Sequence, residues 1–108
     1  MAHPLSGRIW EGFIIEQIIR NLKSKLIPFD YSYYRTQNQA EIDLVLEIKK
    51  KVIPIEIKTG TNYQKKTLIG LKEFMKNFYS PFGIVINNSD RIALIEDNVI
   101  QIPATFLF

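Results

Sequence analysis

Two apolar runs that carry charged side chains decide the fold of this chain: Ala40-Glu41-Ile42-Asp43-Leu44-Val45-Leu46-Glu47-Ile48 and Val52-Ile53-Pro54-Ile55-Glu56-Ile57-Lys58. Both are typical of buried β-strands, in which successive side chains point to opposite faces. In the first run the side chains expected on the core face are Ile42, Leu44, Leu46 and Ile48. Asp43 is expected on the other face, with Glu41, Val45 and Glu47. In the second run Glu56 and Lys58 share the face opposite the isoleucines.

The two runs are joined only by Lys49-Lys50-Lys51, and so short a connection predicts an antiparallel hairpin. Such a hairpin brings Asp43, Glu56 and Lys58 onto one surface. Carboxylate oxygens suit a hard divalent cation, and a lysine can hold or activate a water molecule. The pattern indicates metal-assisted phosphodiester hydrolysis. The alternative from the same pattern is a solvated sheet face on which Lys58 forms a structural salt bridge with Glu56 or Asp43.

Further elements follow on both sides of the hairpin. Helical periodicity predicts a largely buried helix from Leu5 to Lys25 and a second helix from Tyr63 to Tyr79. The strands predicted outside the hairpin are Phe29–Thr36, Gly83–Ile86 and Ile92–Glu96, with Val99–Ile102 as a further short candidate. Pro54 conflicts with a central strand because proline lacks a ladder donor. Either its strand starts pairing late on one side, or Pro54 faces an unpaired position.

Composition narrows the class of protein. The 108 residues suffice for a single domain, 1–108, and 46% hydrophobic against 23% charged residues is ordinary for a folded chain. There is no cysteine and one histidine, which excludes thiolate and multi-histidine metal sites and leaves oxygen ligands. We find no membrane-length apolar run and no signal-peptide pattern, and we therefore expect a cytoplasmic protein without membrane contact. The net charge of +3 permits nucleic-acid binding without requiring it.

A family resemblance sharpens these expectations. A helix with a glutamate, followed by strands with Asp and Glu-x-Lys and a second helix, resembles the PD-(D/E)XK nuclease superfamily. Its restriction-endonuclease-like fold is α/β, with an α-β-β-β-α-β core and a central mixed sheet flanked by helices. The strings that resemble a domain of unknown function at the C-terminus of prokaryotic AAA-type ATPases are Gly7-Arg8-Ile9-Trp10-Glu11-Gly12-Phe13, Tyr34-Arg35-Thr36, Ala40–Val45 and Ile53–Gly60.

The resemblance implies a role for each matching position. Asp43 and Glu56 would be metal ligands, completed by the backbone carbonyl of Ile57, for Mg²⁺ or Mn²⁺. Lys58 would position or deprotonate the attacking water, and Glu16 matches the helix glutamate that orients water or reaches a second metal. The proline that names the motif is replaced by Ile42. The nucleic-acid contacts expected are Arg35, Gln64, Lys65 and Lys66.

Three functions follow as competing expectations. The first is a Mg²⁺-dependent deoxyribonuclease in which water is activated near Lys58. The second is a catalytically silent interaction module of an AAA-type ATPase, and the third is a nucleic-acid-binding module without catalysis. The chain has no Gly-x-x-x-x-Gly-Lys-Ser/Thr phosphate loop, so an ATPase domain would have to lie outside it. Homodimers are common among relatives of this kind. Tyr33 and Tyr34 could stack on bases, but core and edge packing is favoured for both.

Overall fold

The structure is a computed structural model that describes residues 4–35, 41–60 and 65–108. Its helices are α1 (Pro4–Ser24), α2 (Lys65–Asn77) and a terminal 3₁₀ helix, η1 (Ala104–Leu107). Its strands are β1 (Asp30–Arg35), β2 (Glu41–Ile48), β3 (Lys51–Ile57), β4 (Gly83–Asn87), β5 (Ala93–Glu96) and β6 (Val99–Pro103). The predicted element order, including the last short strand, is confirmed, and η1 was not predicted.

The strands form one mixed six-stranded sheet in the order β1-β2-β3-β4-β6-β5. β1, β2 and β3 are antiparallel neighbours, so the predicted hairpin is confirmed. β4 runs parallel to β3 and to β6, and β5 pairs antiparallel with β6. The sequence did not predict that β6 lies between β4 and β5 in the sheet. β6 buries alternate side chains, whereas β5 buries none fully, and the more exposed strand occupies the edge.

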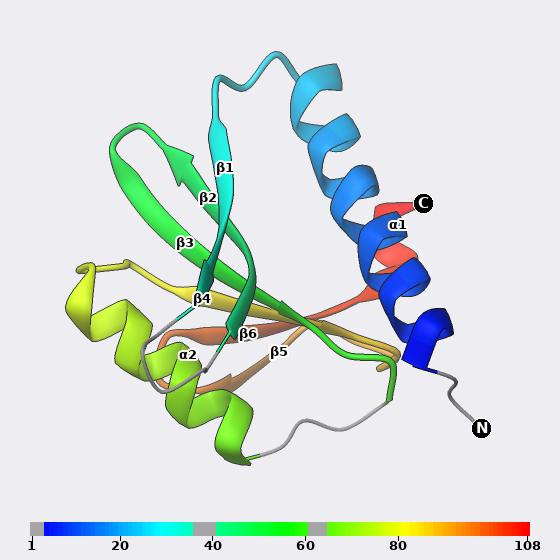
Figure 1. Ribbon diagram of the computed structural model, residues 1–108. Coiled ribbons are helices and arrows are strands. Elements are labelled where there is room, and N and C mark those ends of the chain that lie inside the picture. Colours follow the sequence, from blue (N-terminus) through cyan, green and yellow to red (C-terminus); the bar gives the residue numbers. More distant parts are fainter. Residues whose placement is uncertain (1–3, 36–40, 61–64) are drawn as a thin grey trace.

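Each face of the sheet is covered by one long helix, so the class is mixed α/β with three layers (Figure 1). Ile14 and Ile18 of α1 pack in one core cluster, and Leu71 and Phe74 of α2 pack in the other. The prediction of a largely buried first helix is wrong. Because α1 contacts the sheet on one side only, Ile9 remains 64% exposed. None of the described helices combines the length and the apolar character that crossing a membrane requires.

Pro54 lies inside the sheet and is fully buried. It is the partner of Val45 on the β2 side, whereas the pairing of β3 with β4 begins only at Ile55. Of the two possibilities left open by the sequence, late pairing on one side is therefore the observed one. The missing N–H of Pro54 costs no ladder hydrogen bond toward β4.

The hairpin turn between β2 and β3 is tighter than predicted. Ile48 pairs directly with Lys51, so the connection has two residues, Lys49 and Lys50, with φ of 52° and 68°. Two consecutive positive φ angles are typical of a type I′ turn, which favours Asn-Gly. Side chains other than glycine or asparagine are strained by roughly 1–2 kcal/mol per residue in the left-handed region.

Replacing Lys49-Lys50 by Asn-Gly is therefore expected to stabilise the protein by about 1 kcal/mol, because it relieves this strain. Urea unfolding followed by circular dichroism measures the effect. Lys51→Asn, which changes a strand residue outside the turn, serves as the control. An unchanged or lower unfolding midpoint for the double variant would show that the turn stores no strain.

Candidate active site between β2, β3 and α1

Asp43 and Glu56 meet where β2 and β3 stop pairing. The regular register ends at Leu44 opposite Ile55. Beyond this pair, main-chain N–H groups donate to carboxylates of the opposite strand instead of to main-chain carbonyls. The main-chain N–H of Ile57 donates to Asp43 Oδ2 at 2.8 Å, and the N–H of Asp43 donates to Glu56 Oε1 at 3.2 Å. Each carboxylate is thereby held by the backbone of the opposite strand and retains a second oxygen for another partner.

A β-bulge in β2 lies at Asp43 and interrupts the regular alternation of side chains there. Along β1 the step from Ser32 to Tyr34 covers two residues, but the opposing step from Val45 to Ile42 covers three. The extra residue is a β-bulge, which breaks the alternation of faces and re-aims nearby side chains. Ile42 and Val45 consequently belong to the same core cluster on the α2 side. The prediction that Ile42 shares a face with Leu44 and Leu46 is wrong, because it assumed an unbroken strand.

The helix glutamate beside Asp43 is Glu11. A side-chain hydrogen bond joins Glu11 to Asp43. Glu16 lies five residues further along α1, hence roughly 140° around the helix axis. Its carboxylate is exposed and pairs with Arg20 at 2.8 Å. The placement of Glu16 at the site is therefore corrected to Glu11.

The spacing of Glu11 along α1 identifies it only once the face of the helix that meets the sheet is known. Glu11 stands three and seven positions before Ile14 and Ile18, which are both buried. Residues at this spacing share one helix face, so Glu11 faces the sheet. Glu16 falls outside this stripe and pairs with Arg20 one turn further along the helix.

Burial is the largest cause of a raised pKa at each of the three carboxyl groups. Burial, followed by the charge of Asp43, raises the pKa of Glu56 to about 8. Burial, together with the charge of Asp43 and the hydrogen bond to it, raises the pKa of Glu11 to about 7. Burial also raises the pKa of Asp43, although the N–H of Ile57, the hydrogen bond from Glu11 and Lys58 oppose this shift. If all three carboxyl groups were ionised, their charge would exceed that of Lys58, the ammonium described beside them, and the raised pKa values reflect the cost of that state.

Lys58 stands at the mouth of this group. Its Nζ lies 3.7 Å from Glu56 Oε2, and its side chain is 35% exposed against 7% for Glu56. The predicted salt bridge therefore exists, but 3.7 Å is too long for a hydrogen bond, and the ammonium is open to solvent. The Lys58 backbone is fixed because its N–H donates to the carbonyl of Ile86 at 2.8 Å.

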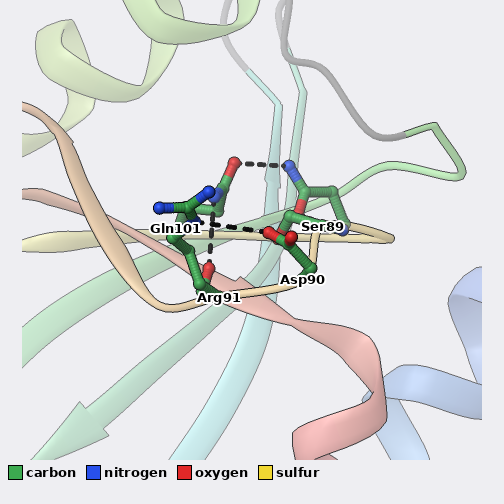
Figure 2. A network of polar contacts seen from close by, with 5 residues as sticks. Ser89, Asp90, Arg91 and Gln101 are labelled. Carbon is green, nitrogen blue, oxygen red and sulfur yellow. Dashed lines mark hydrogen bonds and ion pairs between the residues drawn. The ribbon is translucent and has the colours of Figure 1, made fainter.

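The segment after Lys58 is anchored by the end of β4. The N–H of Asn88 donates to the Gly60 carbonyl at 2.9 Å, and its side-chain amide donates to the Thr59 carbonyl. The residue before it, Asn87, is buried and donates to Gln101 of β6 at 3.0 Å. Gln101 in turn donates to the main-chain carbonyl of Arg91, and Figure 2 shows Gln101 beside Ser89, Asp90 and Arg91 of the loop between β4 and β5. Hydrogen bonds from the end of β4 thus hold the segment that follows Lys58.

The donor set fits a hard divalent cation in its chemistry. Asp43 and Glu56 offer carboxylate oxygens, which are donors that Mg²⁺ or Mn²⁺ prefers, and a bound cation would favour their ionised forms. In an extended strand the N–H and C=O of one residue point to the same side, so we expect the Ile57 carbonyl on the side where its N–H meets Asp43. Within residues 4–35, 41–60 and 65–108, no three His, Asp or Glu side chains surround a common metal position. The candidate ligand set is therefore a carboxylate pair with main-chain and water oxygens.

The residues predicted to contact nucleic acid have different environments. Arg35 forms an ion pair with Glu41 at the start of β2, so the carboxylate offsets the positive charge that Arg35 presents. Lys65 and Lys66 are exposed at the start of α2, and Gln64 lies outside the described residues. Tyr34 packs edge-on against Phe74 at 5.0 Å, which confirms the packing interpretation for this tyrosine. Tyr33 is 65% exposed and therefore does not pack in the core.

Fold and site together define a mixed α/β domain with a backbone-anchored carboxylate pair and an adjacent lysine. The chain belongs to the family described as "Domain of unknown function (DUF4143)", whose model matches residues 6–107. It is 33% identical over 107 residues to uncharacterized proteins of Mycobacterium bovis and Mycobacterium tuberculosis. The match covers 94% of this chain and 22% of each relative. The chain thus spans about a fifth of the length of these curated relatives.

Proposed function

We propose that this domain is a nuclease of the PD-(D/E)XK type, which hydrolyses DNA phosphodiesters with Mg²⁺ or Mn²⁺. The observation that carries the proposal is the crossed anchoring of Asp43 and Glu56 on each other's strands, with Lys58 beside them. The order α1-β1-β2-β3-α2-β4 agrees with the restriction-endonuclease-like core, which supports the finer assignment of the fold.

Each residue has a defined task in this proposal. Asp43 and Glu56, with the Ile57 carbonyl, would hold the ion, which supplies charge neutralisation at the phosphoryl group. The exposed ammonium of Lys58 would donate a hydrogen bond to the scissile phosphate or hold the attacking water. Glu11 would keep Asp43 in position through their hydrogen bond and accept a proton near neutral pH. Lys65 and Lys66 would contact the DNA backbone.

Plasmid nicking tests the proposal directly. Supercoiled DNA is incubated with the wild-type protein and Mg²⁺ or Mn²⁺, and the relaxed form is quantified. We expect nicking that requires the metal and disappears in Asp43→Asn. A wild-type protein that binds the metal but leaves supercoiled, linear and single-stranded DNA intact would overturn the proposal.

Substitutions of Glu11 and Glu16 are expected to have different effects in the same nicking assay. Glu11→Gln is expected to lower the nicking rate about 10–100-fold, because partners that orient metal ligands typically have effects of this size. Glu16→Gln, the matched control, is expected to retain wild-type activity because its carboxylate is exposed and pairs with Arg20. Equal losses in both variants would contradict the assignment of Glu11.

An apolar surface supports a second candidate, the silent interaction module. Phe13 and Phe108 are 42% and 64% exposed, and their rings lie 5.3 Å apart between α1 and the end of the chain. Exposed aromatic groups of this kind are typical of contact surfaces. This candidate predicts association with a second copy or an ATPase domain and no cleavage with either metal. Sedimentation of the wild-type protein against Phe13→Ser measures self-association.

A further inference from the structure

A second hollow lies apart from the carboxylate pair, on the α2 face of the outer strands. It encloses about 410 Å³ between the β1-β2-β3 strands and the end of α2. The lining residues that matter here are Asp30, Tyr34, Val45, Glu47, Val52 and Phe78. Asp43, Glu56 and Lys58 do not line it, so it is independent of the proposed cleavage site.

Two unpaired carboxylates face each other at this hollow. Asp30 of β1 is the direct partner of Glu47 of β2 in the antiparallel register. Directly opposed residues have Cβ atoms about 5 Å apart, and like charges in such pairs are destabilising. In the described part of the chain neither carboxylate forms an ion pair. The pair is therefore left without a counter-ion from the surrounding described structure.

Aromatic rings form the opposite wall. Phe74 and Phe78 of α2 stack at 4.4 Å, and Tyr34 meets Phe78 edge-on at 5.4 Å. Phe78 is still 41% exposed, so its ring is available to a guest. Val45 and Val52, neighbours of Ser32 and Glu47 in the sheet, add apolar surface between the rings and the acids.

We propose that this hollow binds an arginine side chain presented by a partner protein. A guanidinium is planar, stacks on aromatic faces and donates bidentate hydrogen bonds to carboxylates, and its aliphatic stem packs on apolar surface. The hollow offers all three complements: the Phe78 ring, the Asp30–Glu47 pair and the two valines. The protein as a whole carries a net charge of +3, so general electrostatics do not draw a cation here. The attraction is local to this pair of acids.

The test uses the peptide acetyl-Ala-Arg-Ala-amide as the probe and ¹H–¹⁵N chemical shifts of the chain as the readout. We expect saturable shifts of residues around Asp30, Glu47 and Phe78. The same peptide with citrulline, a neutral isostere, is expected to bind at least about fivefold more weakly, because charge-assisted hydrogen bonds are roughly twice as strong as neutral ones. Asp30→Asn/Glu47→Gln is expected to abolish the difference between the peptides.

Asp90→Asn/Asp97→Asn is the matched control, since it removes the same charge from exposed residues outside the hollow and should bind like wild type. A second readout guards against misfolding. Without peptide, Asp30→Asn/Glu47→Gln should melt at the wild-type temperature or above, because a like-charge pair is removed. Equal binding of the arginine and citrulline peptides, shifts confined to other surfaces, or no shifts would each overturn the proposal. None of these outcomes depends on DNA cleavage.

Discussion

Lys58→Ala is expected to lower the rate of metal-dependent DNA nicking at least about 100-fold while it leaves metal binding intact. The Lys58 ammonium is not part of the candidate ligand set. Among the described residues, it is the positive charge that acts on both Asp43 and Glu56. Removing a group that acts on the reacting atoms typically costs 10²–10³-fold or more. The nicking rate with Mg²⁺ and the Mn²⁺ dissociation constant are measured on the same preparation.

Lys51→Ala provides the matched control because Lys51 is exposed at the other end of the same strand, about 20 Å away along β3. It removes the same charge and should nick DNA at the wild-type rate. If Lys58→Ala and Lys51→Ala lose activity equally, the lysines act through general attraction for DNA. If Lys58→Ala is fully active, Lys58 has no role in the chemistry.

The stability of the metal-free protein is expected to fall as the pH rises from about 5.5 to 8.5. The pKa of Glu56 is raised to about 8 and that of Glu11 to about 7, whereas in the unfolded chain both are near 4.3. The folded state therefore binds more protons than the unfolded state in this interval. The stabilisation from these groups is complete below the unfolded pKa and is lost as the pH passes through the folded values. We expect a loss on the order of 2 kcal/mol.

Urea unfolding at several pH values in EDTA measures this loss. Glu56→Gln should flatten the pH dependence, because its amide has no proton to lose, and Glu16→Gln should retain the wild-type slope. Addition of Mg²⁺ should restore stability most strongly at the alkaline end, where the carboxylates are ionised. A wild-type stability that is constant or rises between pH 6 and 8.5 would contradict the raised pKa values of Glu56 and Glu11.

Much of this architecture follows from local sequence patterns. The short connection between the two apolar runs predicted the β2–β3 hairpin, and the alternation along them predicted the approach of Asp43, Glu56 and Lys58. The stripe that includes Leu68, Leu71 and Phe74 predicted α2. These features depend on alternation and on short connections, which act within one or two neighbouring elements.

The features that escaped prediction depend on longer-range packing. The bulge at Asp43 is visible only in the register of β1 against β2, and the position of β6 only in the pairing with β4. The choice of Glu11 over Glu16 required knowing which face of α1 meets the sheet, because apolar residues surround most of that helix. The Lys49-Lys50 turn carries neither asparagine nor glycine, so its left-handed conformation had no signal in the sequence.

The proposed function requires that the backbone-anchored pair Asp43–Glu56 holds one divalent ion. Calorimetric titration of Mn²⁺ into the wild-type protein and Asp43→Asn at about pH 8 tests it most directly, with Glu16→Gln as the control. One saturable site in the wild type and the control, absent from Asp43→Asn, is the predicted result. No binding by the wild type, or undiminished binding by Asp43→Asn, would contradict the claim.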